Sequence, residues 1–164
     1  MKRLIWLGCL SYMVIGMAQV AAGAVLVPLI GAYGVDYGDG GQFIMNQFLG
    51  FLIGVLAAPY ASGKLGRRNA MVLALGCLTA AEAAYSLLPP WGWMLAFAPM
   101  AGIGFGMTEA VLGAIIIEFV TDGKASAMAK LETFFGVGAL ALPLLAGALI
   151  RLGVWQRAFP IITA

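Results

Sequence analysis

The chain has 164 residues, of which 63% are hydrophobic and 10% charged, and its mean hydropathy is +1.00. A soluble domain averages about 45–50% apolar and about 25% charged residues, so an ordinary soluble fold is excluded and a bilayer protein is favoured. The net charge of +2 comes with no basic stripe, and we expect no nucleic-acid partner. Because histidine is absent, we expect no metal, no cofactor and no enzymatic activity.

Long apolar segments follow one another along the whole chain. A helix needs about 20 apolar residues to cross a bilayer, and the segments that reach this length are residues 4–32, 42–61, 70–88, 93–120 and 125–150. Another apolar run occupies residues 158–164, which we expect to be the truncated start of a sixth helix. The sequence therefore predicts one all-α transmembrane domain over residues 1–164, without a soluble domain and without an evident internal repeat.

The basic residues favour one orientation of this domain. Cytoplasmic loops carry an excess of Lys and Arg. If the spans alternate, seven of the nine basic residues share one side with the N-terminus, and only Arg151 and Arg157 oppose them. We therefore expect a cytoplasmic N-terminus. The seven residues are Lys2, Arg3, Lys64, Arg67, Arg68, Lys124 and Lys130.

Three acidic residues fall inside the expected spans, where a charge is costly and usually functional. Glu109 and Glu132 lie about 12 Å and about 10 Å into antiparallel neighbouring helices, so they should reach a similar depth. Two carboxyls at one depth in a low dielectric disfavour joint ionisation, and one of them can then hold a proton. The alternatives are that each acid ties helices together by hydrogen bonding, or that Lys130 neutralises Glu132. Glu82 lies closer to a helix end and is expected to snorkel to the interface.

Uncharged polar residues and glycines complete the set of candidates. Gln19, Asn46 and Gln47 either bond a polar solute or bridge helices, and the sequence leaves both readings open. The glycines are expected to allow close helix crossing rather than to bind a nucleotide, because no strand precedes them. They are Gly102, Gly104 and Gly106, the pair Gly50 and Gly54, and the pair Gly136 and Gly138.

The segment between the second and third spans resembles the loop Gly-x-x-x-Asp-Arg-x-Gly-Arg-Arg/Lys of the major facilitator superfamily. Lys64, Gly66, Arg67 and Arg68 match this pattern, whereas Gly63 stands where the family has Asp. In the family this acid helps to lock the loop to neighbouring helices in one transport conformation, and the resemblance implies that the four matching residues form this conformational loop.

A second resemblance covers about residues 43–145 and is closest to the bacterial glucose/mannose:proton symporters of the fucose-permease group. It is carried by segments 47–59, 106–113 and 130–145. In that group a glutamate on the fourth helix contacts the sugar and takes part in proton coupling, and Glu109 occupies its position. The first-helix Asp of those permeases is missing, since Ala24 stands four residues before Pro28.

The resemblance implies the N-terminal six-helix half of a twelve-helix transporter in a bacterial-type cell membrane. The expected function is proton-coupled uptake of a sugar or a similar small polar solute by alternating access. The expected partners are the solute, protons, the lipid bilayer and either the missing C-terminal half or a second copy. The alternatives are a proton-driven exporter of the same superfamily and a small membrane scaffold or half-transporter subunit.

Overall fold

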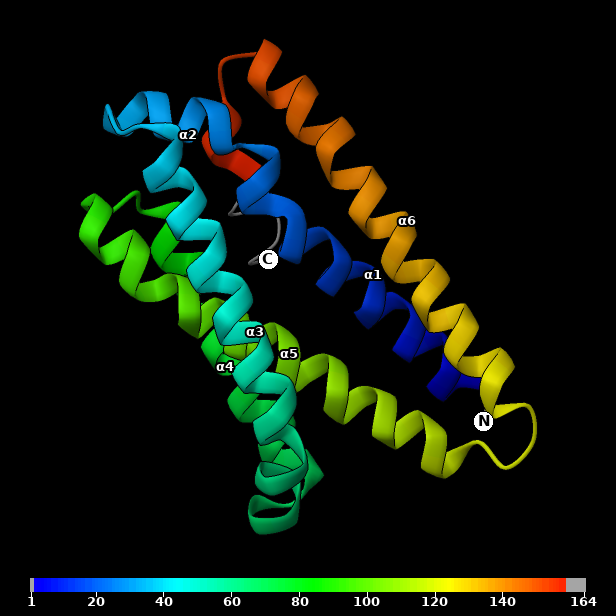
Figure 1. Cartoon of the computed structure of the whole chain (residues 1–164). Coiled ribbons are helices and arrows are strands. Elements are labelled where there is room, and N and C mark those ends of the chain that lie inside the picture. Colours follow the sequence, from blue (N-terminus) through cyan, green and yellow to red (C-terminus); the bar gives the residue numbers. More distant parts are fainter. Residues whose placement is uncertain (1, 159–164) are drawn as a thin grey trace.

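The computed structural model describes residues 2–158, which form a bundle of helices (Figure 1). The expected helix over residues 158–164 lies outside the described residues except for Ala158. Within the described part the chain contains no strand, which confirms the all-α prediction. The elements are α1 (Lys2–Ala24), α2 (Leu26–Tyr33), α3 (Tyr37–Leu65), α4 (Arg67–Ser86), α5 (Trp91–Phe119), α6 (Lys124–Arg151) and the 3₁₀ turn η1 (Trp155–Arg157).

Two helix boundaries differ from the sequence prediction for identifiable reasons. The first span is divided into α1 and α2, because Pro28 lacks the N–H that would bond the carbonyl of Ala24. The second span starts at Tyr37 instead of residue 42, because a capping box of Asp36 and Asp39 extends the helix into a polar segment. Apolar length alone could reveal neither effect.

Length and composition allow four of the described helices to cross a membrane, and these are α1, α3, α5 and α6. The third expected span is present as the 20-residue α4. Its lower apolar content comes from Arg67, Arg68 and Asn69 in its first turn and from Glu82 near its other end. Figure 1 shows the N-terminus, the α3–α4 junction and the α5–α6 loop at one end of the bundle.

Close backbone contact between α3 and α5 is made possible by glycine. A Cβ at Gly102 would collide with the carbonyl oxygen of Gln47, and a Cβ at Gly106 with that of Phe51. From the other side, Gly50 and Gly54 face the carbonyl oxygens of Pro99 and Ile103. Gly104 faces α4 in the same way, at Leu78 and Ala74. The expectation of tight glycine crossings is confirmed for these positions.

Glycine also makes the close crossing of α1 with α6 possible. A Cβ at Gly16 would collide with the carbonyl oxygen of Phe135, and one at Gly138 with that of Met13. Gly136, which we expected to act with Gly138, has no atom within 4 Å of such a Cβ, so that expectation is wrong. On a helix the two positions lie about 200° apart, and only one of them can face α1.

The two crossings are copies of each other, which corrects the expectation of no evident repeat. Each residue of α5 corresponds to the residue of α1 numbered 90 lower, and each residue of α3 to the residue of α6 numbered 84 higher. By this rule the contact of Gly106 with Phe51 corresponds to that of Gly16 with Phe135. The contact of Gly54 with Ile103 corresponds to that of Gly138 with Met13. The sequence segments agree as well: Gly-Met-Thr-Glu at 106–109 corresponds to Gly-Met-Ala-Gln at 16–19. Because α1 runs opposite to α5 and α6 opposite to α3 (Figure 1), this is an inverted repeat.

Candidate solute and proton site

Glu109 on α5 and Glu132 on α6 line one pocket, as the depth argument predicted. The pocket has a volume of about 380 Å³ and is otherwise built mainly from small and apolar side chains, including Val55 of α3. Tyr12 of α1 joins it and donates its hydroxyl to the backbone carbonyl of Glu109 at 3.1 Å. Sequence reasoning missed Tyr12, although a phenol in the middle of an apolar span signals a buried hydrogen bond.

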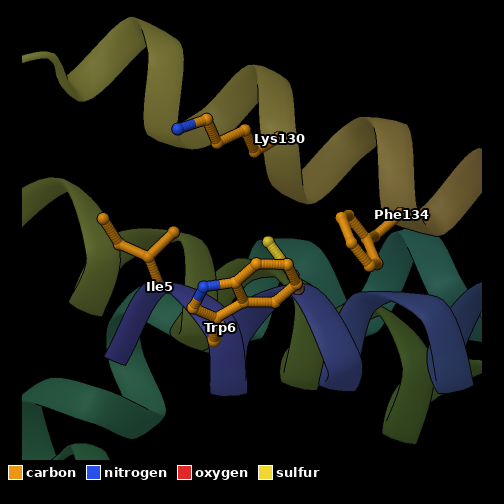
Figure 2. Close-up of a pocket in the computed structure, with 5 residues that line it drawn as sticks. Ile5, Trp6, Lys130 and Phe134 are labelled. Carbon is orange, nitrogen blue, oxygen red and sulfur yellow. The ribbon is translucent and has the colours of Figure 1, made fainter. Parts of the chain in front are cut away.

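Lys130 occupies a different pocket from Glu132, which contradicts the alternative that it neutralises that acid. It lines a cavity of about 490 Å³ between α1 and α6 together with Ile5, Trp6, Cys9 and Phe134 (Figure 2). Among the described residues, no ion pair joins Lys130 to Glu132. The carboxyl of Glu132 therefore shares its pocket with another acid and with no cation.

Gln19 and Gln47 meet at a second pocket, of about 370 Å³, which also involves Ile44, Phe48 and Pro143. Gln47 is 5% exposed and donates its Nε2 to the backbone carbonyl of Gln19 at 3.3 Å. The side-chain oxygens of both glutamines are buried and have no hydrogen-bond partner among the described residues. Asn46, which the sequence grouped with them, lies half-buried and lines neither this pocket nor the acidic one.

Glu82 does not snorkel to the interface as expected. It is 2% exposed, and its Oε2 has no hydrogen-bond partner within the described part of the chain. The helical face that carries it also carries Leu78 and Tyr85, which pack into the main core. α4 ends at Ser86, soon after Glu82, but closeness to a helix end did not predict the direction in which the side chain points.

The loop between α3 and α4 is held to α5 by an ion pair between Arg67 and Glu118. Gly66 makes the turn possible, since its φ of +79° is a conformation that other residues rarely adopt. Lys64 lies over the ring of Tyr60, 4.6 Å from its centre, and Arg68 is exposed. Gly63, in the position of the family's Asp, is an open helical residue. Glu118 is an acid near this loop that the sequence reasoning did not single out.

Comparisons with known proteins agree with this architecture. The chain is 31% identical over 148 residues to the glucose/mannose transporter GlcP of Bacillus subtilis (strain 168), covering 90% of this chain and 37% of that protein. It is 23% identical over 157 residues to the niacin transporter NiaP of Acinetobacter baylyi, covering 95% of this chain and 36% of NiaP. The chain thus spans little more than a third of these curated relatives. No solved structure matches.

The family assignment rests on most of the chain. The sequence model described as Major Facilitator Superfamily matches residues 8–164. Both relatives are transporters and not enzymes. With its all-helical fold and its multiple membrane-spanning helices, this chain belongs to the major facilitator superfamily of membrane transporters.

Proposed function

We propose that the chain forms part of a proton-coupled transporter that takes up a sugar or a similar small polar solute. The observation that carries this proposal is the meeting of Glu109 and Glu132 in one open pocket, where Glu109 is half-buried and Glu132 is exposed. A carboxyl at membrane depth is expensive unless it is paired, protonated or hydrated. Neither acid has an ion-pair partner among the described residues, so proton binding is the chemistry that this pocket supports.

The coupling step uses the repulsion between the two acids. When both are ionised their charges repel in a low dielectric, and a single proton relieves this repulsion. The titratable groups that face Glu109 are Glu132 on α6 and the Tyr12 hydroxyl on α1, while α3 contributes the apolar Val55. Proton arrival and departure would therefore change the charge of the pocket and bias the transporter between its two access states.

The loop residues Lys64, Gly66, Arg67 and Arg68 are proposed to stabilise one of these states. The Arg67–Glu118 ion pair joins the α3–α4 turn to the end of α5 and supports this role. The basic residues at this end of the bundle support a cytoplasmic N-terminus. We propose that the opposite wall of the solute cavity comes from a C-terminal six-helix half or a second copy.

The test is the substitution Glu109→Gln in the complete transporter, reconstituted into vesicles with an imposed pH gradient. We expect uphill accumulation of the solute to be lost, because the amide keeps the shape of the side chain but binds no proton. Asn46→Ala is the control, since Asn46 lines neither pocket. Unchanged uphill accumulation by Glu109→Gln would remove this residue from the coupling mechanism.

A competition panel separates uptake of sugars from the alternatives. Glucose and mannose, nicotinate and lipophilic cations are each added in excess during uptake. Inhibition by the sugars supports the proposal, and it is compatible with the likeness to a glucose/mannose transporter. Inhibition by the cations alone would favour an exporter, and inhibition by nicotinate alone would point to a carboxylated solute.

A further inference from the structure

The amide pocket and the acidic pocket are related by the inverted repeat. Applying the same offsets that superpose the glycine crossings carries six residues of the acidic pocket onto six residues that line the amide pocket. The matched pairs are Glu109 with Gln19, Ala110 with Val20, Gly113 with Gly23, Ala114 with Ala24, Met128 with Ile44, and Glu132 with Phe48.

The internal hydrogen bonds of the two pockets end on equivalent backbone carbonyls, although their donors do not correspond, since the offsets pair Tyr12 with Gly102 and Gln47 with Leu131. In the acidic pocket the backbone carbonyl of Glu109 accepts a hydrogen bond from Tyr12. In the amide pocket the backbone carbonyl of the equivalent residue, Gln19, accepts one from Gln47. The two pockets thus share the arrangement of their backbone. They differ in chemistry at two positions, where Gln19 and Phe48 stand in place of Glu109 and Glu132.

The orientation of Gln47 determines what the amide pocket offers to a ligand. Because its Nε2 is engaged by the Gln19 carbonyl, its Oε1 remains as a hydrogen-bond acceptor. The Oε1 of Gln19 is a second acceptor without a partner among the described residues. Buried acceptors without partners are costly, so the cost is offset when a ligand supplies hydrogen-bond donors.

We infer that the two repeat-related pockets divide the work of one transport site: Gln19 and Gln47 bind hydroxyl groups of an uncharged solute, while Glu109 and Glu132 carry the proton. This inference rests on the proposed function and assigns its two tasks to separate places. The amide pocket has no charged lining residue and offers acceptors, so it suits hydroxyl donors. A carboxylate such as nicotinate would find no cation there, and its own oxygens would face other acceptors.

The experiment compares Gln47→Leu with Glu109→Gln in the complete reconstituted transporter, with Asn46→Leu as the neighbouring control on α3. Solute exchange at equal pH on both sides reports binding, and accumulation under a pH gradient reports coupling. We expect Gln47→Leu to raise the half-saturation concentration about three- to tenfold, as for the loss of one hydrogen bond, and to keep accumulation at saturating solute. Glu109→Gln should keep the half-saturation concentration and lose accumulation.

Monodeoxy analogues of the transported sugar distinguish direct binding from a structural effect. The analogue that lacks the hydroxyl bound by Gln47 should bind more weakly than the sugar in the wild type and equally well in Gln47→Leu. If every analogue keeps its wild-type ratio in both Gln47→Leu and Gln19→Ala, the amide pocket does not bind hydroxyls and the inference is overturned. Gln19→Ala also replaces Gln47→Leu if the latter fails to fold.

Failure of the proposed function has a different signature. If the wild type shows no proton-driven accumulation, or if no sugar competes for uptake, the proposed function is wrong whatever the variants do. If the wild type behaves as proposed but Gln47→Leu loses accumulation with an unchanged half-saturation concentration, only the division between the two pockets is wrong.

Discussion

The α3–α5 crossing and the α1–α6 crossing share two glycine contacts but differ in how closely the helices approach elsewhere. In the first crossing, Gly50 and Gly102 add two more contacts of glycine with a backbone carbonyl. The repeat places Phe134 and Tyr12 at the equivalent positions of the second crossing, and a cavity of about 490 Å³ opens there beside Phe134 (Figure 2). The α3–α5 crossing is therefore closely packed, whereas the equivalent α1–α6 crossing leaves space between its helices.

The repeat therefore conserves the geometry of the helix contacts while its side chains diverge. The glycines that fix the crossing are retained in both copies, because backbone atoms occupy the space that a side chain would need. The positions that line the pockets have changed from acid to amide or aromatic. Substitutions of the glycines test the crossings, and a substitution of Tyr12 tests the hydrogen bond that joins α1 to the acidic pocket.

The largest effect is expected for Gly102→Leu in the closely packed crossing. The new side chain would collide with the backbone of α3 at Gln47, which cannot move without breaking helical hydrogen bonds. We expect a destabilisation of more than about 3 kcal/mol, at the upper end of overpacking, and little folded protein. The measurement is the monodisperse fraction in size-exclusion chromatography after detergent extraction.

The control for this substitution is Gly76→Leu on α4, where a Cβ meets no atom within 4 Å. It adds the same apolar volume to a helix of the same bundle and should leave the yield of monodisperse protein unchanged. An equal loss for both variants would indicate general intolerance of leucine in this bundle and would contradict the crossing argument.

A smaller effect is expected in the more open crossing, from Gly138→Ala on α6. A methyl group there also meets the carbonyl oxygen of Met13, but it adds far less volume than a leucine side chain. We expect a loss of about 1–3 kcal/mol, measured as a lower melting temperature in detergent. Gly136→Ala is the matched control two residues away, with open space around its Cβ. A melting temperature as low for Gly136→Ala as for Gly138→Ala would show that the Met13 contact is not the cause.

Part of the fold follows from the sequence, because apolar length and residue spacing are one-dimensional signals. The helical nature of the long apolar segments was predicted from their length, and the close crossings at Gly50, Gly54 and Gly102 from their small side chains. The meeting of Glu109 with Glu132 was predicted from their similar depth. The inverted repeat was not, because its two copies agree only at scattered positions and its offsets differ between helices. These offsets become visible when backbone contacts show which residues are equivalent.

The sequence also did not predict the direction in which individual side chains point. Glu82 was expected to reach the interface and Lys130 was a candidate to neutralise Glu132, but Glu82 is buried and Lys130 lines a pocket apart from Glu132. A helix turns about 100° per residue, so an error of one residue in the buried face reverses such an assignment. Hydropathy does not show which face of a helix is buried when most of its faces are apolar.

The smallest effect is expected from Tyr12→Phe, which removes the hydrogen bond from α1 to the Glu109 carbonyl and keeps the ring. A side-chain hydrogen bond between membrane helices contributes about 0.6 kcal/mol on average and at most about 2 kcal/mol. We therefore expect a fall of a few degrees in melting temperature, and none for Tyr37→Phe, whose side chain is 70% exposed. The acceptor carbonyls of Glu109 and Gln19 are equivalent in the repeat, whereas the donors Tyr12 and Gln47 are not. We expect the loss to match that of Gln47→Leu within about 1 kcal/mol, because each variant removes one hydrogen bond to an equivalent carbonyl. A far larger loss for Tyr12→Phe would mean that the acidic pocket depends on this link in a way that its amide counterpart does not, and the two pockets would then share their geometry but not their energetics.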